Sequence, residues 1–130
     1  SSSRFANTAG FTDADHVASP RDLAALTRIA MESPIFREIV ATAQHGCTVN
    51  GSSGYRRNVV WRNTNRLLKT EGYDGVKTGT TRAAGACLVS RGARDGRRLI
   101  VVVLGSSSSD ARYSDTRNLF RWAWRQLEAE

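Results

Sequence analysis

The 130-residue sequence has little cysteine, proline and lysine, and it has no long apolar segment. Its longest apolar run, Leu99 to Leu104, is far shorter than the roughly 20 residues that a membrane-spanning helix needs. The only cysteines, Cys47 and Cys87, stand forty residues apart, and neither belongs to a Cys-x-x-Cys pair. This spacing argues against a zinc site. Two free thiols or one disulfide in an oxidising compartment both fit it.

Basic residues are concentrated in the second part of the chain. The formal net charge is +7. Residues 1–55 carry a net charge of −1, whereas residues 56–130 carry +8. A positive field of this kind attracts nucleic acid, anionic lipid, an anionic polymer or a carboxylate substrate, and charge alone does not choose among them. Because seventeen of the nineteen basic residues are arginine, Lys69 and Lys77 stand out.

The composition, 40% hydrophobic and 24% charged, is that of a globular protein, and we expect residues 1–130 to form one domain. Each of the two prolines follows a serine, as in a helix that begins with a serine cap and a proline in its first turn. We therefore predict short amphipathic helices from Pro20 and Pro34. Their predicted core faces consist of Leu23, Leu26, Thr27 and Ala30 in the first helix and Phe36, Ile39 and Val40 in the second.

The remaining pattern is mostly that of strands. Glycine, serine and asparagine at 46–54 predict a turn-rich excursion, and 56–62 predicts a short strand. Three further strands are predicted at 73–81, 84–91 and 98–104, with Asp95-Gly96 as the hairpin turn between the last two.

The apolar run of the last strand indicates a central position, covered on both faces. We expect a loop at 105–109 and then a helix, about 114–127, that lies across the sheet. These elements predict an α+β fold with an antiparallel sheet.

The segment Lys77-Thr-Gly-Thr-Thr81 combines a cation, hydroxyl groups and nearly bare backbone on one predicted strand. Small side chains let a substrate peptide pair with such a strand, and an ammonium and a hydroxyl can bind a carboxylate. The alternative is a solvated edge strand that a lysine protects from aggregation.

The flanking segments favour a site. The chain resembles the serine D-alanyl-D-alanine carboxypeptidases among the low-molecular-mass penicillin-binding proteins, of the peptidase S11 type. The resemblance rests on motifs that occur in the family's order and cover nearly the whole chain. They lie at 5–11, 16–24, 63–68, 74–81 and 98–105, and Arg112 follows them.

Members of this family combine three motifs, of which this sequence has only Lys-Thr-Gly. It contains neither Ser-x-x-Lys nor Ser-x-Asn. Two segments have a threonine in place of the serine of Ser-x-Asn, namely Thr48-Val-Asn50 and Thr116-Arg-Asn118. We interpret both as structural. In the family's order the two missing motifs precede residues 5–7, so we expect them upstream of Ser1. The chain then corresponds to the C-terminal part of such an enzyme, with the last three strands of the sheet, and by itself is expected to be inactive.

The resemblance implies a role for each matching residue. Lys77 would provide positive charge in the active site and belong to its proton-transfer network. Thr78 and Gly79 would bind the substrate, with the Thr78 hydroxyl on the terminal carboxylate. The Thr80 N–H would form half of an oxyanion hole, the other half belonging to the absent serine. Arg112 would bind the same carboxylate, although a solvated loop arginine is the alternative.

The implied activity is release of the terminal D-alanine from peptidoglycan stem peptides through an acyl-enzyme, with β-lactams as further ligands and no metal or cofactor. The expected location is periplasmic or extracytoplasmic. A partner is expected to cover an apolar edge or face of the sheet, either the upstream part of the same protein or a second copy of the chain.

Other candidates for chemistry are weaker. Neither His16 nor His45 has a nucleophile and an acidic residue beside it in the sequence, so we assign them no catalysis. The arginines of 56–66 and 97–98 are interpreted as solvated faces, and no nucleic-acid partner is expected. A non-catalytic module that binds wall peptides or wall polymer is the alternative function.

Overall fold

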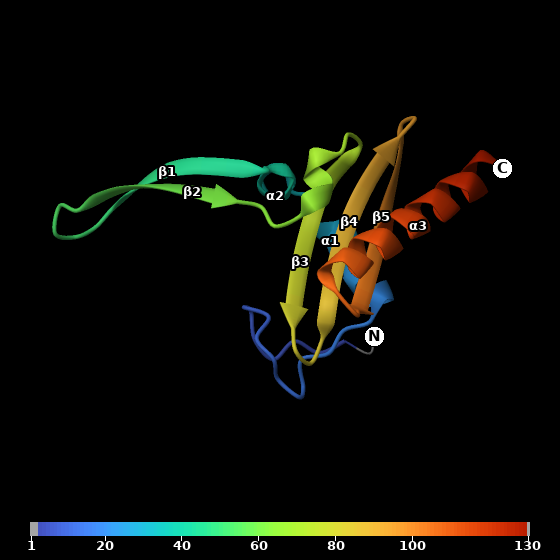
Figure 1. The fold of residues 1–130 in the computed structure, drawn as a ribbon, viewed down its shortest axis with the longest axis horizontal. Helices are drawn as coiled ribbons and strands as arrows, with labels where there is room; N and C mark the ends of the chain where they lie inside the picture. Colours follow the sequence, from blue (N-terminus) through green and yellow to red (C-terminus); the bar gives the residue numbers. More distant parts are fainter. Residues whose placement is uncertain (1–2, 130) are drawn as a thin grey trace.

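A computed structural model describes residues 3–129, which form two antiparallel sheets and three α-helices (Figure 1). This arrangement confirms the predicted α+β fold. The elements in chain order are α1 (Pro20–Ala30), α2 (Pro34–Ala41), β1 (Gln44–Asn50), β2 (Arg56–Arg62), the 3-10 helix η1 (Arg66–Lys69), β3 (Tyr73–Thr81), β4 (Gly85–Arg94), β5 (Arg97–Ser106) and α3 (Ser109–Glu128).

The first two helices begin where the serine-proline pairs predicted them. The hydroxyl of Ser19 accepts a hydrogen bond from the Asp22 N–H, and Ser33 caps α2 in the same way. The predicted core faces are only partly right, because Leu26 and Ile39 are exposed. Each helix makes its main contact with one strand, α1 with β5 and α2 with β3, so the outer part of its apolar stripe remains in solvent.

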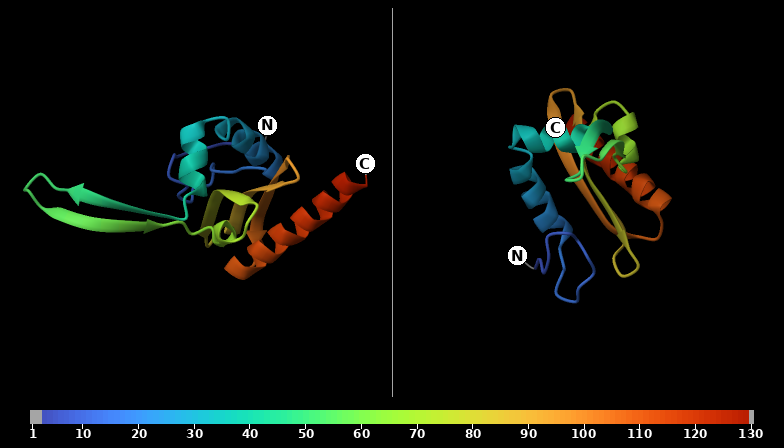
Figure 2. Two further views of the ribbon diagram at one scale, coloured as in Figure 1. Left: turned by 90° about the horizontal axis from the view of Figure 1, so that it is seen from above. Right: turned by 90° about the vertical axis from the view of Figure 1, so that its left-hand side faces the viewer.

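The main sheet has the order β3-β4-β5 with antiparallel pairs throughout. Its second hairpin closes through Asp95-Gly96, and both residues have the positive φ that a type I′ turn requires. The central strand is therefore β4, and the prediction of a central position for residues 98–104 is wrong. These residues are nevertheless apolar on both faces, because α1 covers one face of β5 and α3 covers the other (Figure 2).

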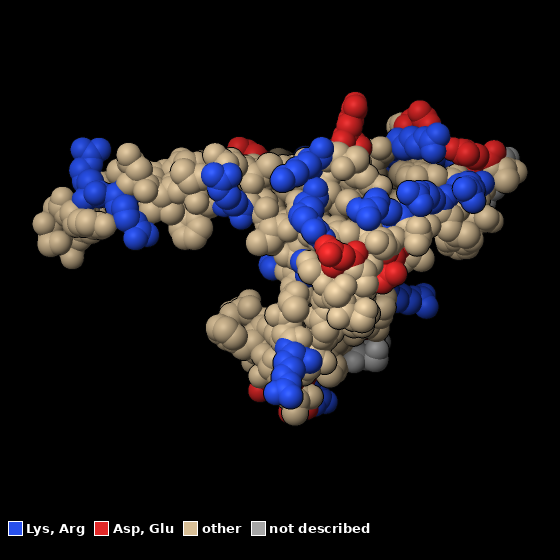
Figure 3. Space-filling view, viewed as in Figure 1, with Lys and Arg blue, Asp and Glu red and all other residues tan. Residues whose placement is uncertain are grey.

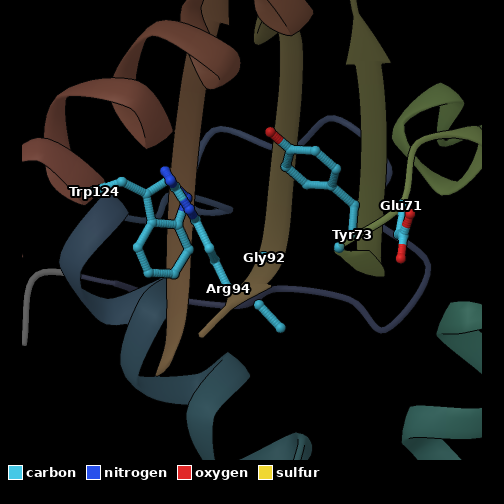
Figure 4. Close-up of a pocket in the computed structure, with 7 residues that line it drawn as sticks. Glu71, Tyr73, Gly92, Arg94 and Trp124 are labelled. Atoms are coloured by element: carbon cyan, nitrogen blue, oxygen red, sulfur yellow. The ribbon is translucent and has the colours of Figure 1, made fainter. Parts of the chain in front are cut away.

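Helix α3 packs on the sheet through Phe120, which is only 1% exposed. The Phe120 ring meets Tyr73 edge-on, at 5.1 Å between centroids, and stacks on Trp124 at 6.5 Å. A Cβ at Gly92 would lie 2.8 Å from the Phe120 ring, so a glycine permits this close approach. Trp124 and Tyr73 also line a hollow at the end of the sheet where β3 begins (Figure 4).

The same helix begins at Ser109, five residues before the predicted start, because Ser108 supplies an N-cap by accepting a hydrogen bond from the Ala111 N–H at 3.0 Å. Much of the predicted loop at 105–109 is therefore strand end, cap and first turn. As a result Arg112 lies within the helix and is buried, not on a solvated loop.

Strands β1 and β2 form a hairpin, here called the arm, that projects from the rest of the molecule (Figure 1). The strand at 56–62 is confirmed, but the turn-rich excursion predicted for 46–54 is mostly strand β1. Its residues pair with β2 from Gln44 opposite Arg62 to Asn50 opposite Arg56. Only the tip is a turn, closed by a hydrogen bond from the Gly51 N–H to the Tyr55 carbonyl at 2.7 Å.

Large apolar side chains are exposed on the layer formed by the N-terminal segment, α1 and α2. They include Phe5, Phe11, Ile29, Ile35 and Ile39. These side chains belong to this layer and not to the sheet, for which an uncovered apolar edge or face is predicted. Both cysteines are free, Cys47 on the arm and Cys87 on β4. Within residues 3–129 no helix has the length and apolarity of a membrane span.

Candidate active site

Strand β3 carries Lys77, Thr78, Gly79 and Thr80 along an edge of the main sheet. Within the described residues 3–129 only β4 pairs with β3, so the other side of the strand is open to an added peptide strand. Neighbouring side chains of a strand point to opposite faces, which places Thr78 and Thr80 on one face and Lys77 on the other. Helix α3 approaches the face that carries Thr78 and Thr80, because Arg112 of α3 donates a hydrogen bond to the Thr80 hydroxyl.

The Arg112 guanidinium reaches from the first turn of α3 to the end of β3. Its Nη1 donates to the Thr80 hydroxyl at 3.0 Å, to the Gly79 carbonyl at 3.2 Å and to the Cys87 carbonyl at 3.3 Å. Its Nη2 donates to the Ser109 hydroxyl at 3.1 Å. Arg112 thus holds the ends of β3 and β4 together and sits directly behind two of the predicted site residues.

This arginine is a buried cation without a counter-ion. Arg112 is 7% exposed, its Nε has no hydrogen-bond partner, and no carboxylate of residues 3–129 forms an ion pair with it. The Tyr113 ring, with its centroid 5.1 Å from the guanidinium carbon, offers only a weak cation-π contact. Because an unpaired buried charge is costly, a guanidinium in this state favours the binding of an anion.

Thr78 is also buried, and its hydroxyl lies 2.6 Å from the hydroxyl of Thr64. The Thr64 carbonyl in turn accepts a hydrogen bond from the Tyr113 hydroxyl at 3.0 Å, and that hydroxyl accepts one from the Arg66 N–H. Sequence reasoning assigned no role to Thr64 or Tyr113. The segment 63–68 is part of the family resemblance, but nothing in it indicates that Thr64 contacts Thr78, fourteen residues further along the chain.

Lys77 stands apart from this cluster. It is exposed, and its ammonium donates a hydrogen bond to the carbonyl of Thr78 on its own strand. The structure therefore brings together four of the five predicted site residues, Thr78, Gly79, Thr80 and Arg112. The Lys77 side chain lies on the opposite face of the strand.

Two ion pairs stabilise the surroundings of β3. Asp74 binds Arg91 of β4 through both carboxylate oxygens, and this bond raises the pKa of the Arg91 guanidinium. Arg66 of η1 pairs with Asp110 at the start of α3, at 2.5 Å, and the bond to Asp110 raises the pKa of Arg66. The first pair fixes β3 on β4, and the second joins η1 to α3.

Three of the weaker candidates, His16, Thr48 and Thr116, make structural contacts. The His16 ring accepts a hydrogen bond from the Ala6 N–H at 3.1 Å and meets Phe5 edge-on, and His45 lies on the arm. Thr48 bonds Asn58 across the arm, and the buried Thr116 donates to the Arg112 carbonyl at 2.6 Å. Within residues 3–129 no group of three metal-ligating side chains occurs.

Comparison with known proteins identifies the family. The model of the D-alanyl-D-alanine carboxypeptidases, peptidase family S11, matches residues 1–108. The chain belongs to this family. One relative, the D-alanyl-D-alanine carboxypeptidase of Streptomyces strain K15, is 34% identical over 117 residues, which are 88% of this chain and 40% of the relative. The enzyme DacD of Escherichia coli is 36% identical over 106 residues, or 80% of this chain and 25% of DacD.

Solved structures give the same family and its fold. A mutant of the Streptomyces K15 DD-transpeptidase superposes with a TM-score of 0.90 at 33% identity, over 95% of this chain and 48% of that one. Penicillin-binding protein D2 of Listeria monocytogenes, in its cefotaxime-bound form, matches with a TM-score of 0.56 at 30% identity, over 74% of this chain and 36% of that one. The chain thus spans about half, or less, of the length of these family members.

Proposed function

We propose that this chain supplies the Lys-Thr-Gly strand and the carboxylate subsite of a serine-type D-alanyl-D-alanine carboxypeptidase, and that residues 1–130 are the C-terminal part of that catalytic domain. Its substrate is the D-alanyl-D-alanine end of a peptidoglycan stem peptide, outside the cytoplasm. One observation carries the proposal: Arg112 is a buried cation without a counter-ion, and it touches Thr80 and Gly79 of the open strand. Membership of the family supports the substrate class.

In this proposal the substrate's terminal carboxylate lies near Thr78, Thr80 and Arg112. The Thr78 hydroxyl donates to it, and the hydroxyl of Thr64, 2.6 Å away, can donate to Thr78 at the same time. The Arg112 guanidinium, which contacts Thr80 and Gly79, adds positive charge next to this position. The substrate backbone pairs with the open edge of β3, as the absence of a second neighbour for this strand allows.

We assign the nucleophile and its base to an upstream segment of the protein, because residues 1–130 contain no Ser-x-x-Lys motif. A serine hydroxyl attacks the carbonyl between the two D-alanines and transfers its proton to the base. The Thr80 N–H and the N–H of that serine stabilise the oxyanion. The amide bond breaks, D-alanine leaves with the proton, and water then hydrolyses the ester. Lys77 stabilises negative charge and takes part in these proton transfers.

The carboxylate subsite can be tested on the chain alone. We expect acetyl-lysyl-D-alanyl-D-alanine to shift the NMR signals of the Arg112 Nε–H and of the Thr78 and Thr80 amides, because its carboxylate binds there. The matched control is the same peptide with a C-terminal amide, which lacks the charge and should shift these signals far less. Equal shifts with both peptides would contradict the proposed subsite.

A further inference from the structure

A groove of about 400 Å³ lies where the arm joins α2, apart from the proposed carboxylate subsite. Trp61, Arg62 and His45 line it from the arm, and Glu38 lines it from α2. None of the residues of the proposed carboxylate subsite belongs to its lining. Its volume is near the lower end of the range for small-molecule sites, which suits a short segment of a polymer.

Three side chains of this groove have free polar atoms. Trp61 is 62% exposed and lies directly across the arm from His45, so the two rings share one face of the hairpin. Within residues 3–129 the Trp61 indole N–H, the His45 ring and the Glu38 carboxylate have no hydrogen-bond partner. The groove therefore offers an exposed aromatic face with unused donors and acceptors around it.

The walls of the groove are nevertheless held in place. The Asn63 side-chain amide donates to the carbonyls of Val40 and Thr42, at 3.3 and 3.2 Å, and so ties the end of β2 to the end of α2. Arg62 donates to the Gln44 side chain at 2.8 Å across the first pair of the arm. A ligand would thus bind to a largely preformed surface, which lowers the entropy cost of binding.

The charges of the groove indicate the class of ligand. The chain has no acidic residue between Glu38 and Glu71, and the Lys and Arg side chains on the arm have no acidic side chain beside them there (Figure 3). Yet the groove itself faces the Glu38 carboxylate as well as Arg62, so it is nearly neutral, unlike a site for a polyanion. A sugar ring has an apolar C–H face that can stack on an indole, and hydroxyl and amide groups that can bond to the surrounding polar atoms.

We propose that this groove binds a short neutral stretch of a glycan strand, the polymer to which the stem peptide is attached. The inference rests on the proposed function and extends it to a second subsite. Residues 62–64 join the two subsites: Arg62 lines the groove, and the hydroxyl of Thr64, two residues later, contacts Thr78. The two subsites thus lie on one continuous segment of the chain.

Binding of chitotetraose, a neutral oligomer of N-acetylglucosamine, to the 130-residue chain tests the proposal. We expect a saturable shift of the Trp61 indole N–H signal in NMR spectra. Trp61→Ala should weaken binding at least about tenfold, as for an aromatic anchor. The matched control is Trp122→Ala, because Trp122 on α3 is 63% exposed, almost the same as Trp61, and lies outside the groove.

Several outcomes would overturn the proposal: no saturable shift of Trp61, equal weakening by Trp122→Ala, or binding of poly-L-glutamate but not of chitotetraose. A dispersed spectrum of the Trp61→Ala variant shows that it remains folded. The D-alanyl-D-alanine peptide is expected to shift Arg112 and not Trp61. If that peptide shifts nothing while chitotetraose binds, the proposed carboxylate subsite fails and the glycan groove stands.

Discussion

The arm and the main sheet are both antiparallel, yet different interactions stabilise them. The main sheet is covered by α3 on one face and by α1 and α2 on the other, and it buries Leu88 completely. On the arm no residue is fully buried, and only Cys47 and Val59 are half-buried. An isolated two-stranded hairpin is marginal in water. The sheet therefore accounts for the stability of the molecule, and the arm is free to serve as a binding surface.

The largest expected effect is on the core of the sheet. Phe120→Ala removes the ring that α3 places on Tyr73 and Trp124, so it should lower the free energy of unfolding by about 3–5 kcal/mol. Trp61→Ala removes an aromatic ring of the arm, and its effect should stay within about 0.5 kcal/mol. Urea denaturation of both variants measures the difference. Similar losses in the two would show that the arm shares the stability of the sheet.

A smaller contrast is expected between two glycines. Gly92→Ala would place a Cβ 2.8 Å from the Phe120 ring, and the resulting overpacking should cost about 1–3 kcal/mol. Gly46→Ala on the arm meets nothing within 4 Å. It should leave the free energy of unfolding unchanged or raise it by up to about 1 kcal/mol, because alanine restricts the unfolded chain. If Gly46→Ala were as destabilising as Gly92→Ala, the arm would not be the open surface described above.

Local signals in the sequence predicted the elements that depend on local chemistry. The serine caps of α1 and α2 and the Asp95-Gly96 turn each determine a boundary through nearby backbone groups. Strand β1 was not predicted, because its glycine and polar residues form a strand only by pairing with β2. The edge position of β5 was also not predicted, since an apolar run shows that both faces are covered but not how many strands lie beside it.

The candidate site shows the same limit. The residue pattern predicted the strand that carries residues 77–80, and the family resemblance added their roles and Arg112. The structure brings most of these residues together. The hydroxyl contact between Thr64 and Thr78 could not be predicted, because it depends on how η1 and α3 fold back on β3. Burial of Arg112 was missed for a similar reason: the start of α3 at Ser109 depends on one capping serine within a run of four.

The central claim is that this chain provides one wall of an acylating active site and lacks the nucleophile. Labelling with a fluorescent penicillin tests it most directly, with the chain alone and fused behind the part of the Streptomyces K15 DD-transpeptidase that precedes the matched region. We predict no labelled band for the chain, a labelled band for the folded fusion, and at least about a hundredfold slower labelling when Lys77→Ala removes the positive charge beside the reacting bond. A labelled band from the chain alone, or a fusion whose labelling does not depend on Lys77, would contradict the claim.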